Sequence, residues 1–120
     1  MSGKKEMYTD ETKGVLQKRF TKFDGWEIFY RPKMGKVVPD FLCELALEEK
    51  KYRVIVNIKS ESMVSQSDVK KIANGAKSLA GKDIVIFAKI LVVPSNVTIP
   101  ATIQKSIESN KIEVLYLKGV

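Results

Sequence analysis

The sequence predicts an α/β protein in which a mixed β-sheet is flanked by helices on both faces. Two observations lead to this prediction: helix-like and strand-like patterns alternate along the chain, and a tight polar turn joins two strand-like runs. Together the patterns give the order α-β-β-β-α-β-α-β, which is typical of a sheet covered by helices. The length of 120 residues, of which 44% are hydrophobic, suits one modest core. We therefore expect a single domain over residues 1–120.

The first third of the chain predicts one helix and one strand. Residues 1–8 are polar and are expected to be flexible. A helix is predicted over 9–22, where apolar side chains recur at intervals of three to four residues. Asp24-Gly25 ends it, and the aromatic and β-branched run 26–31 predicts a strand, followed by a basic loop over 32–36.

The middle of the chain predicts an antiparallel hairpin. Residues 37–47 and 52–59 both read as strands, and the charged stretch EEKK at 48–51 forms the tight turn between them. Because side chains alternate along a strand, Asp40 and Glu44 should lie on one face of the first strand, four residues apart.

The last part of the chain predicts a second helix, a buried strand, a short helix and a final strand. The helix covers 64–79, with a serine cap and Gly81 after its end. The nearly continuous apolar run 83–93 is typical of a strand buried on both faces. A short helix over 101–109 and a strand over 112–117 complete the chain.

The charge balance favours a polyanionic partner. There are 21 Lys and Arg residues against 14 Asp and Glu, for a net charge of +7 and a pI near 9.5. Such a balance in a small domain points first to nucleic acid. The alternative is that the charges only keep the protein soluble, because 18 of the 21 basic residues are lysines. The absence of histidine excludes histidine general bases and histidine-rich zinc sites.

Composition also bears on the compartment. The apolar runs are far shorter than the roughly 20 residues that a membrane-spanning helix needs. The polar N-terminus shows no secretory signal, and the single cysteine, Cys43, is expected to be a small buried residue. A cytoplasmic protein is therefore expected.

A small set of residues in the hairpin carries a resemblance to a known family. Pro39-Asp40 enters the strand 37–47, and Asn57-Ile58-Lys59 ends the strand 52–59, with Asn57 standing 17 positions after Asp40. With these elements in this order, residues 11–117 resemble the PD-(D/E)XK nuclease superfamily, in particular archaeal Holliday-junction resolvases and Mrr-type restriction domains. The resemblance implies a restriction-endonuclease-like α-β-β-β-α-β core with an added α-β at the C-terminus.

The resemblance also implies roles for particular residues. In an active member Asp40 would bind Mg²⁺ or Mn²⁺, Lys59 would position the attacking water or stabilise developing charge, and Glu11 would be the acid of the first helix. Hard cations prefer such oxygen ligands, and the ion makes a bound water more acidic. Each residue also has a purely structural interpretation: a turn residue for Asp40, a solvated strand end for Lys59 and a helix-dipole partner for Glu11.

Asn57 departs from the family pattern, which has an acid at this position. An amide brings no charge, so the affinity for Mg²⁺ should fall sharply. Three explanations are open. A nearby acid, Glu61 or Glu44, has taken over as metal ligand; or the domain has lost cleavage and kept a DNA-binding face; or the asparagine is an introduced inactivating substitution.

Basic residues near this site predict contacts with a phosphate backbone. They are Arg31, Lys33 and Lys36 before Asp40, and Lys70, Lys71 and Lys77 on the second helix. The leading hypothesis is a DNA-binding protein of the nuclease fold, acting as a metal-dependent endodeoxyribonuclease if it is active. The alternative is a catalytically degenerate subunit that binds DNA or assembles with an active partner chain. The resemblance and the short chain also suggest a homodimer, and in a third interpretation the motif is accidental.

Overall fold

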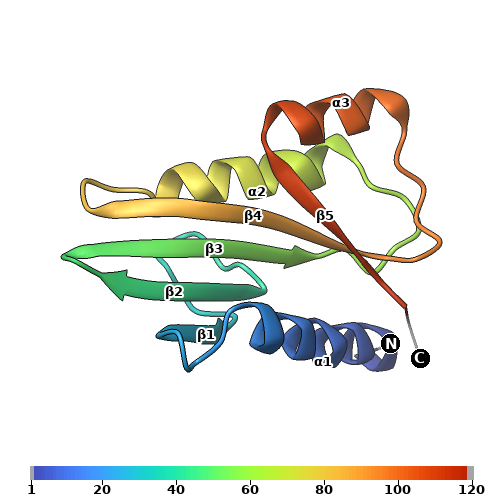
Figure 1. The fold of residues 1–120 in the computed structure, drawn as a ribbon. Helices are drawn as coiled ribbons and strands as arrows, with labels where there is room; N and C mark the ends of the chain where they lie inside the picture. Colours follow the sequence, from blue (N-terminus) through green and yellow to red (C-terminus); the bar gives the residue numbers. More distant parts are fainter. Residues whose placement is uncertain (1, 119–120) are drawn as a thin grey trace.

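The computed structural model describes residues 2–118, and over this range the predicted order of elements is confirmed (Figure 1). The elements are α1 (Ser2–Arg19), β1 (Trp26–Tyr30), β2 (Phe41–Leu47), β3 (Lys50–Ile58), α2 (Gln66–Leu79), β4 (Ile84–Pro94), α3 (Ala101–Ser109) and β5 (Ile112–Leu117). The bounds of α3 and β5 are the predicted ones.

The strands form one mixed sheet whose spatial order, β1-β2-β3-β4-β5, is the order of the chain. The pairs β1–β2 and β2–β3 are antiparallel, as expected for hairpin-connected strands. The pairs β3–β4 and β4–β5 are parallel, and α2 and α3 are the connections between them. The predicted fold class, a mixed sheet flanked by helices, is therefore confirmed.

The helices divide between the two faces of the sheet. Figure 1 shows α1 on one face and α2 with α3 on the other. Side chains alternate along β3, so Val54 and Val56 pack in the cluster that includes α1, whereas Ile55 packs with Ala76 and Leu79 of α2. None of the helices in the described range is long and apolar enough to span a membrane.

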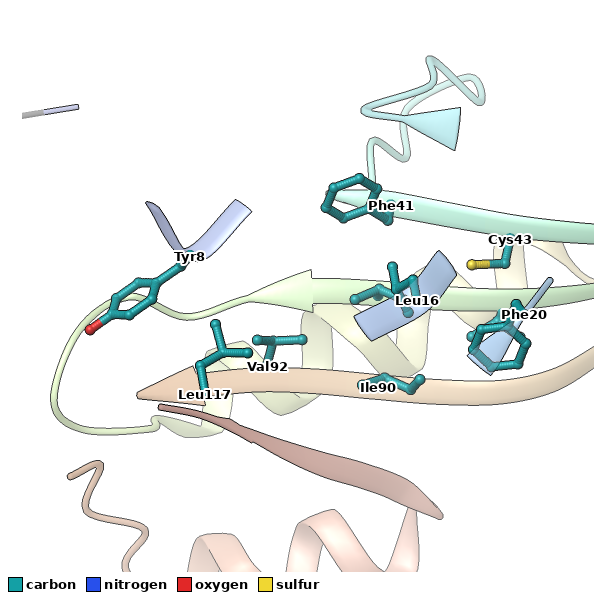
Figure 2. Close-up of a cluster of buried hydrophobic side chains, with 10 residues drawn as sticks. Tyr8, Leu16, Phe20, Phe41, Cys43, Ile90, Val92 and Leu117 are labelled. Atoms are coloured by element: carbon teal, nitrogen blue, oxygen red, sulfur yellow. The ribbon is translucent and has the colours of Figure 1, made fainter. Parts of the chain in front are cut away.

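The largest hydrophobic cluster lies between α1 and the sheet (Figure 2). Leu16 and Phe20 of α1 pack there against Phe41 and Cys43 of β2, and Ile90 of β4. Cys43 is fully buried, and this burial raises the pKa of its thiol to about 12. A thiol that stays protonated at neutral pH is a poor nucleophile, so Cys43 acts as a small core residue.

Thr12 is a polar residue in this otherwise apolar interface. Its side chain is fully buried, and its Oγ1 has no hydrogen-bond partner among the described residues. Burying an unpaired hydroxyl costs roughly 1–3 kcal/mol. We expect Thr12→Val to raise the free energy of unfolding by about 1 kcal/mol in urea titrations. Thr102→Val, at an exposed position of α3, should change it by less than about 0.5 kcal/mol, and an equal gain in both variants would contradict this explanation.

Five element starts differ from the sequence predictions, by one or two residues for β3, α2 and β4 and by more for α1 and β2. The helix predicted over 9–22 is α1, which begins at Ser2 and ends at Arg19. Tyr8, outside the predicted helix, is only 6% exposed and extends the buried stripe of α1 by one turn. The strand predicted from residue 37 begins at Phe41, because Val37 instead forms an isolated bridge with Met34 around Gly35, which has a φ of +69°.

The turn between β2 and β3 is tighter than the four-residue stretch predicted at 48–51. Leu47 pairs with Lys50, so the loop consists of Glu48 and Glu49, whose φ values are +52° and +69°. Two successive left-handed residues match the twist of the strands but cost roughly 1–2 kcal/mol each for residues other than glycine.

Replacing this loop by Asn-Gly should therefore stabilise the fold. We expect Glu48→Asn with Glu49→Gly to raise the free energy of unfolding by about 1–2 kcal/mol in urea titrations, because asparagine and glycine favour these dihedral angles. Glu48→Gln with Glu49→Gln removes the same charges but keeps the backbone cost. A similar gain in the free energy of unfolding of that control would mean that the loss of charge, and not the backbone conformation, causes the stabilisation.

Arg53 is the second buried polar residue, 9% exposed, on the α2 side of β3. Its Nε donates a hydrogen bond of 2.9 Å to Oε2 of Glu44, and its Nη1 donates one of 3.0 Å to the backbone carbonyl of Leu79. The guanidinium thus links β2 to the last turn of α2, where helix carbonyls lack partners within the helix.

Candidate functional site

Asp40 and Asn57 meet where β2 begins and β3 ends. Asp40 directly precedes Phe41, which pairs with Val56, so the antiparallel register sets Asp40 opposite Asn57. The backbone N–H of Asp40 donates to Oδ1 of Asn57 over 3.4 Å, and Oδ2 of Asp40 accepts a bond of 2.7 Å from the backbone N–H of Ile58. Both side chains are half-buried and are engaged by the backbone of the neighbouring strand.

Lys59 lies just after β3 and forms ion pairs with two acids. Its Nζ is 3.1 Å from Oδ2 of Asp68 and 3.2 Å from Oε1 of Glu61. Burial lowers the pKa of Lys59, but the hydrogen bonds to Asp68 and Glu61 outweigh it, and the pKa lies above its ordinary value of 10.5. Lys59 therefore stays charged at neutral pH, with two carboxylates to balance it.

Asp68 is a residue of this region that the sequence analysis missed. It is the third residue of α2 and forms a capping box with Ser65, whose backbone N–H donates to Oδ2 of Asp68 over 2.8 Å. The spacing Ser-x-x-Asp before an apolar helix is a recognisable signal for this cap. It does not reveal that the same carboxylate reaches Lys59, because that contact depends on how the loop 60–65 folds.

A pocket of about 230 Å³ lies beside Asn57, between α2 and the loop that leads to β2. Basic and amide side chains from three segments line it: Lys36 from the loop, Asn57 from β3, and Lys71 and Asn74 from α2. The wall is completed by Gly75 and Ser78 of α2, Ile55 of β3 and the segment Val37–Pro39. The structure thus brings three of the predicted site residues, Lys36, Asn57 and Lys71, to one cavity.

Other predicted site residues lie elsewhere. Glu44 stands about 13 Å along β2 from Asp40, at roughly 3.3 Å per residue, and its carboxylate pairs with Arg53. Glu11 is on α1, across the sheet from α2, and its Oε2 accepts a hydrogen bond of 2.9 Å from the backbone N–H of Lys118. Arg31, Lys33 and Lys70 are exposed and are not among the residues that line the pocket.

The predicted metal ligands Asp40, Glu44 and Glu61 are consequently not assembled. Among residues 2–118 no group of three or more His, Cys, Asp or Glu side chains is placed to hold a metal ion. Glu44 is held by Arg53, Glu61 is turned toward Lys59, and Asp40 faces an amide. One carboxylate and one neutral oxygen do not fit a centre for Mg²⁺ or Mn²⁺, which relies on several oxygen ligands and their charge.

Comparison with known proteins supports the fold. The sequence matches no protein-family model, and no curated protein resembles it significantly. Among solved structures, SfsA of Pyrococcus furiosus in complex with Ca²⁺ is similar over 94% of this chain, with a TM-score of 0.57 and 18% identity. The MspJI restriction endonuclease in complex with a 27-mer oligonucleotide is similar over 92% of this chain, with a TM-score of 0.50 and 10% identity.

These similarities concern the fold and not the whole of either protein. The chain spans 57% of the SfsA chain and 24% of the MspJI chain. At such low identity they show shared architecture alone. The chain has a restriction-endonuclease-like fold, as the arrangement of its hairpin, helices and parallel strands predicts.

Proposed function

We propose that this chain is a DNA-binding protein of the nuclease fold that holds the phosphate backbone without cutting it. The observation that carries the proposal is the pocket where Lys36 and Lys71 meet Asn57. Two ammonium groups from separate segments attract an anion such as a phosphate group. The net charge of +7 favours the approach of the protein to DNA. The oligonucleotide bound by the MspJI endonuclease is consistent with this partner.

Asn57 supports binding in place of metal-assisted cleavage. Its Oδ1 accepts a hydrogen bond from the backbone N–H of Asp40, which leaves the amide N–H groups of Nδ2 as the donors that Asn57 can offer to a ligand. An N–H donor attracts a phosphate oxygen, whereas an acid without a metal ion would repel it. The same position that holds a metal ligand in active nucleases thus suits direct contact with phosphate here.

The test combines binding and cleavage. By fluorescence anisotropy on labelled DNA at 0.15 M salt, Lys36→Ala with Lys71→Ala should weaken binding about tenfold and lower the salt slope by about two. Lys18→Ala with Lys22→Ala, exposed residues at and beyond the end of α1, is the control for charge and should stay within about twofold. Equal losses in both pairs would mean non-specific attraction and would overturn the proposal.

Cleavage assays with Mn²⁺ on duplex, branched and single-stranded DNA separate this proposal from its alternative. The binding protein leaves every substrate intact. The alternative is an Mg²⁺- or Mn²⁺-dependent endonuclease that uses Asp40 and Lys59. It requires that Asp68 or Glu61, which pair with Lys59 in this structure, bind the metal ion instead. Cleavage by the unaltered chain that Asp40→Ala abolishes would establish the endonuclease. DNA binding without cleavage would fit a binding subunit, including one that assembles with an active partner chain.

A further inference from the structure

We propose that the partner is duplex DNA and that α2 enters its major groove, with lysines on the two flanks of the helix contacting the two strands. The inference rests on the proposed function, and it adds a second contact site that lies across α2 from the first. The evidence is a second pocket, the setting of Lys89 within it, and the width of α2.

The second pocket, of about 250 Å³, lies on the other flank of α2. At 100° per residue, the residues that line the first pocket, Lys71, Asn74 and Ser78, are on one side of the helix. Those that line the second, Ala73, Lys77 and Ala80, lie about 120° round the helix axis from them, on its other flank. Ala76, Ile86, Lys89 and Asn110 complete the second pocket. Each flank of the helix therefore has a hollow lined by its own lysine from α2.

Lys89 is the main reason to regard the second pocket as an anion site. It lies on β4 opposite Ile55, on the face that α2 covers, and it is half-buried. No acidic residue lines the pocket, and no salt bridge to Lys89 is formed within the described part of the chain. A partly desolvated ammonium gains most from an opposite charge, and Lys77 in the same pocket adds a second cation. The three alanines leave space for a phosphate to approach.

The spacing of the two flanks matches a duplex groove. An α-helix with its side chains is about 10–12 Å wide, and the major groove of B-DNA is about 12 Å wide. With the helix in the groove, Lys71 and Lys36 would meet one backbone, and Lys77 and Lys89 the other. Lys70 and Asn74 lie opposite the buried face and between the two flanks, so Asn74 would point toward the base edges. Figure 1 shows α2 on the outside of the sheet, away from α1.

This arrangement distinguishes duplex DNA from other nucleic acids. The major groove of A-form RNA is deep and too narrow for side chains to enter, so α2 would not fit there. A single strand offers one backbone and satisfies only one flank. The expected order of affinity is therefore duplex DNA above both single-stranded DNA and duplex RNA of equal length.

The experiment measures binding of a 20-base-pair DNA duplex, the matching RNA duplex and the single DNA strand. We expect Lys77→Ala with Lys89→Ala to weaken duplex DNA binding about tenfold and to lower the salt slope by about two. Lys18→Ala with Lys22→Ala is the charge control, and Lys89→Met replaces Lys89→Ala if circular dichroism shows loss of folding. Dimethyl sulfate footprinting should show protection of guanine N7, which faces the major groove.

The outcomes separate the two proposals. If the Lys77 and Lys89 pair leaves duplex binding unchanged while the Lys36 and Lys71 pair weakens it, this inference fails and the proposed function stands. If neither pair matters, both fail. Affinity for single-stranded DNA or duplex RNA equal to that for duplex DNA would overturn the groove assignment, as would guanine N7 atoms that stay reactive in the complex.

Discussion

Replacing Arg53 with methionine should lower the free energy of unfolding by about 3–5 kcal/mol, the range for breaking a buried ion pair by removing one partner. The side chain is 10% exposed and bonds to two elements at once, β2 and α2. Its loss leaves Glu44, whose side chain is 19% exposed, without its 2.9 Å partner, and leaves the Leu79 carbonyl without its buried donor. Methionine fills most of the volume, so the loss reports on polar pairing and not on a cavity.

Two controls test this explanation in urea titrations. Lys51→Met removes a weaker neighbour of Glu44, 3.9 Å away and 53% exposed, and should cost less than about 0.5 kcal/mol. Glu44→Gln added to Arg53→Met should recover part of the loss, because it removes the isolated charge. A loss below about 1 kcal/mol for Arg53→Met would show that water replaces both hydrogen bonds.

Asn57→Asp should create a binding site for Mn²⁺, so that the ion stabilises the folded variant. The parent protein should not be stabilised by Mn²⁺. The substitution sets a second carboxylate opposite Asp40, across the junction where β2 begins and β3 ends. Two adjacent carboxylates repel each other without metal, so the variant should be less stable than the parent in chelator. At an Mn²⁺ concentration about a hundredfold above the dissociation constant, binding would add about 2.7 kcal/mol to its stability.

Thermal unfolding with and without Mn²⁺ checks this prediction, and cleavage of labelled DNA extends it. We expect the ion to raise the melting temperature of Asn57→Asp, but not of the parent or of Asn57→Asp with Asp40→Ala. Cleavage gained by Asn57→Asp would identify a dormant site on an intact nuclease fold. A melting temperature insensitive to Mn²⁺ would mean that the bond from Ile58 to Asp40 holds this carboxylate away from a shared ion.

The order of elements was predictable because each has a strong periodic pattern and clear ends. The apolar run of β4 matches its burial over Ile90–Pro94, whereas Val85 and Phe87 in its first half are exposed. The prediction of a strand buried on both faces therefore holds only for the second half of β4. The start of α1 was not predictable in this way. Its first turns are polar, and only the burial of Tyr8 against the sheet, a tertiary contact, identifies them as part of the packed helix.

The candidate site was predictable only where it depends on strand pairing. Asp40 and Asn57 face each other because the hairpin register sets them there, and the sequence indicates that hairpin. The ion pair between Arg53 and Glu44 follows from the same register. Predicting that register requires the two-residue turn, and the sequence does not reveal that Glu48 and Glu49 adopt left-handed conformations. The contact of Asp68 with Lys59 depends on the path of the loop 60–65 and has no local signal.

The strand order also has a consequence for how the chain folds. Within residues 2–118, each strand pairs only with the strand before it and the strand after it in the sequence. No strand has to wait for a partner beyond its neighbour in the sequence. The parallel pairs, such as Lys51 with Ile84, should nevertheless form more slowly than the hairpin, because a helix must first cross between the strands. As the chain leaves the ribosome, β1, β2 and β3 can pair before β4 exists, and each later strand adds to the edge formed just before it. The growing sheet thus always has its open edge next to the segment synthesised next.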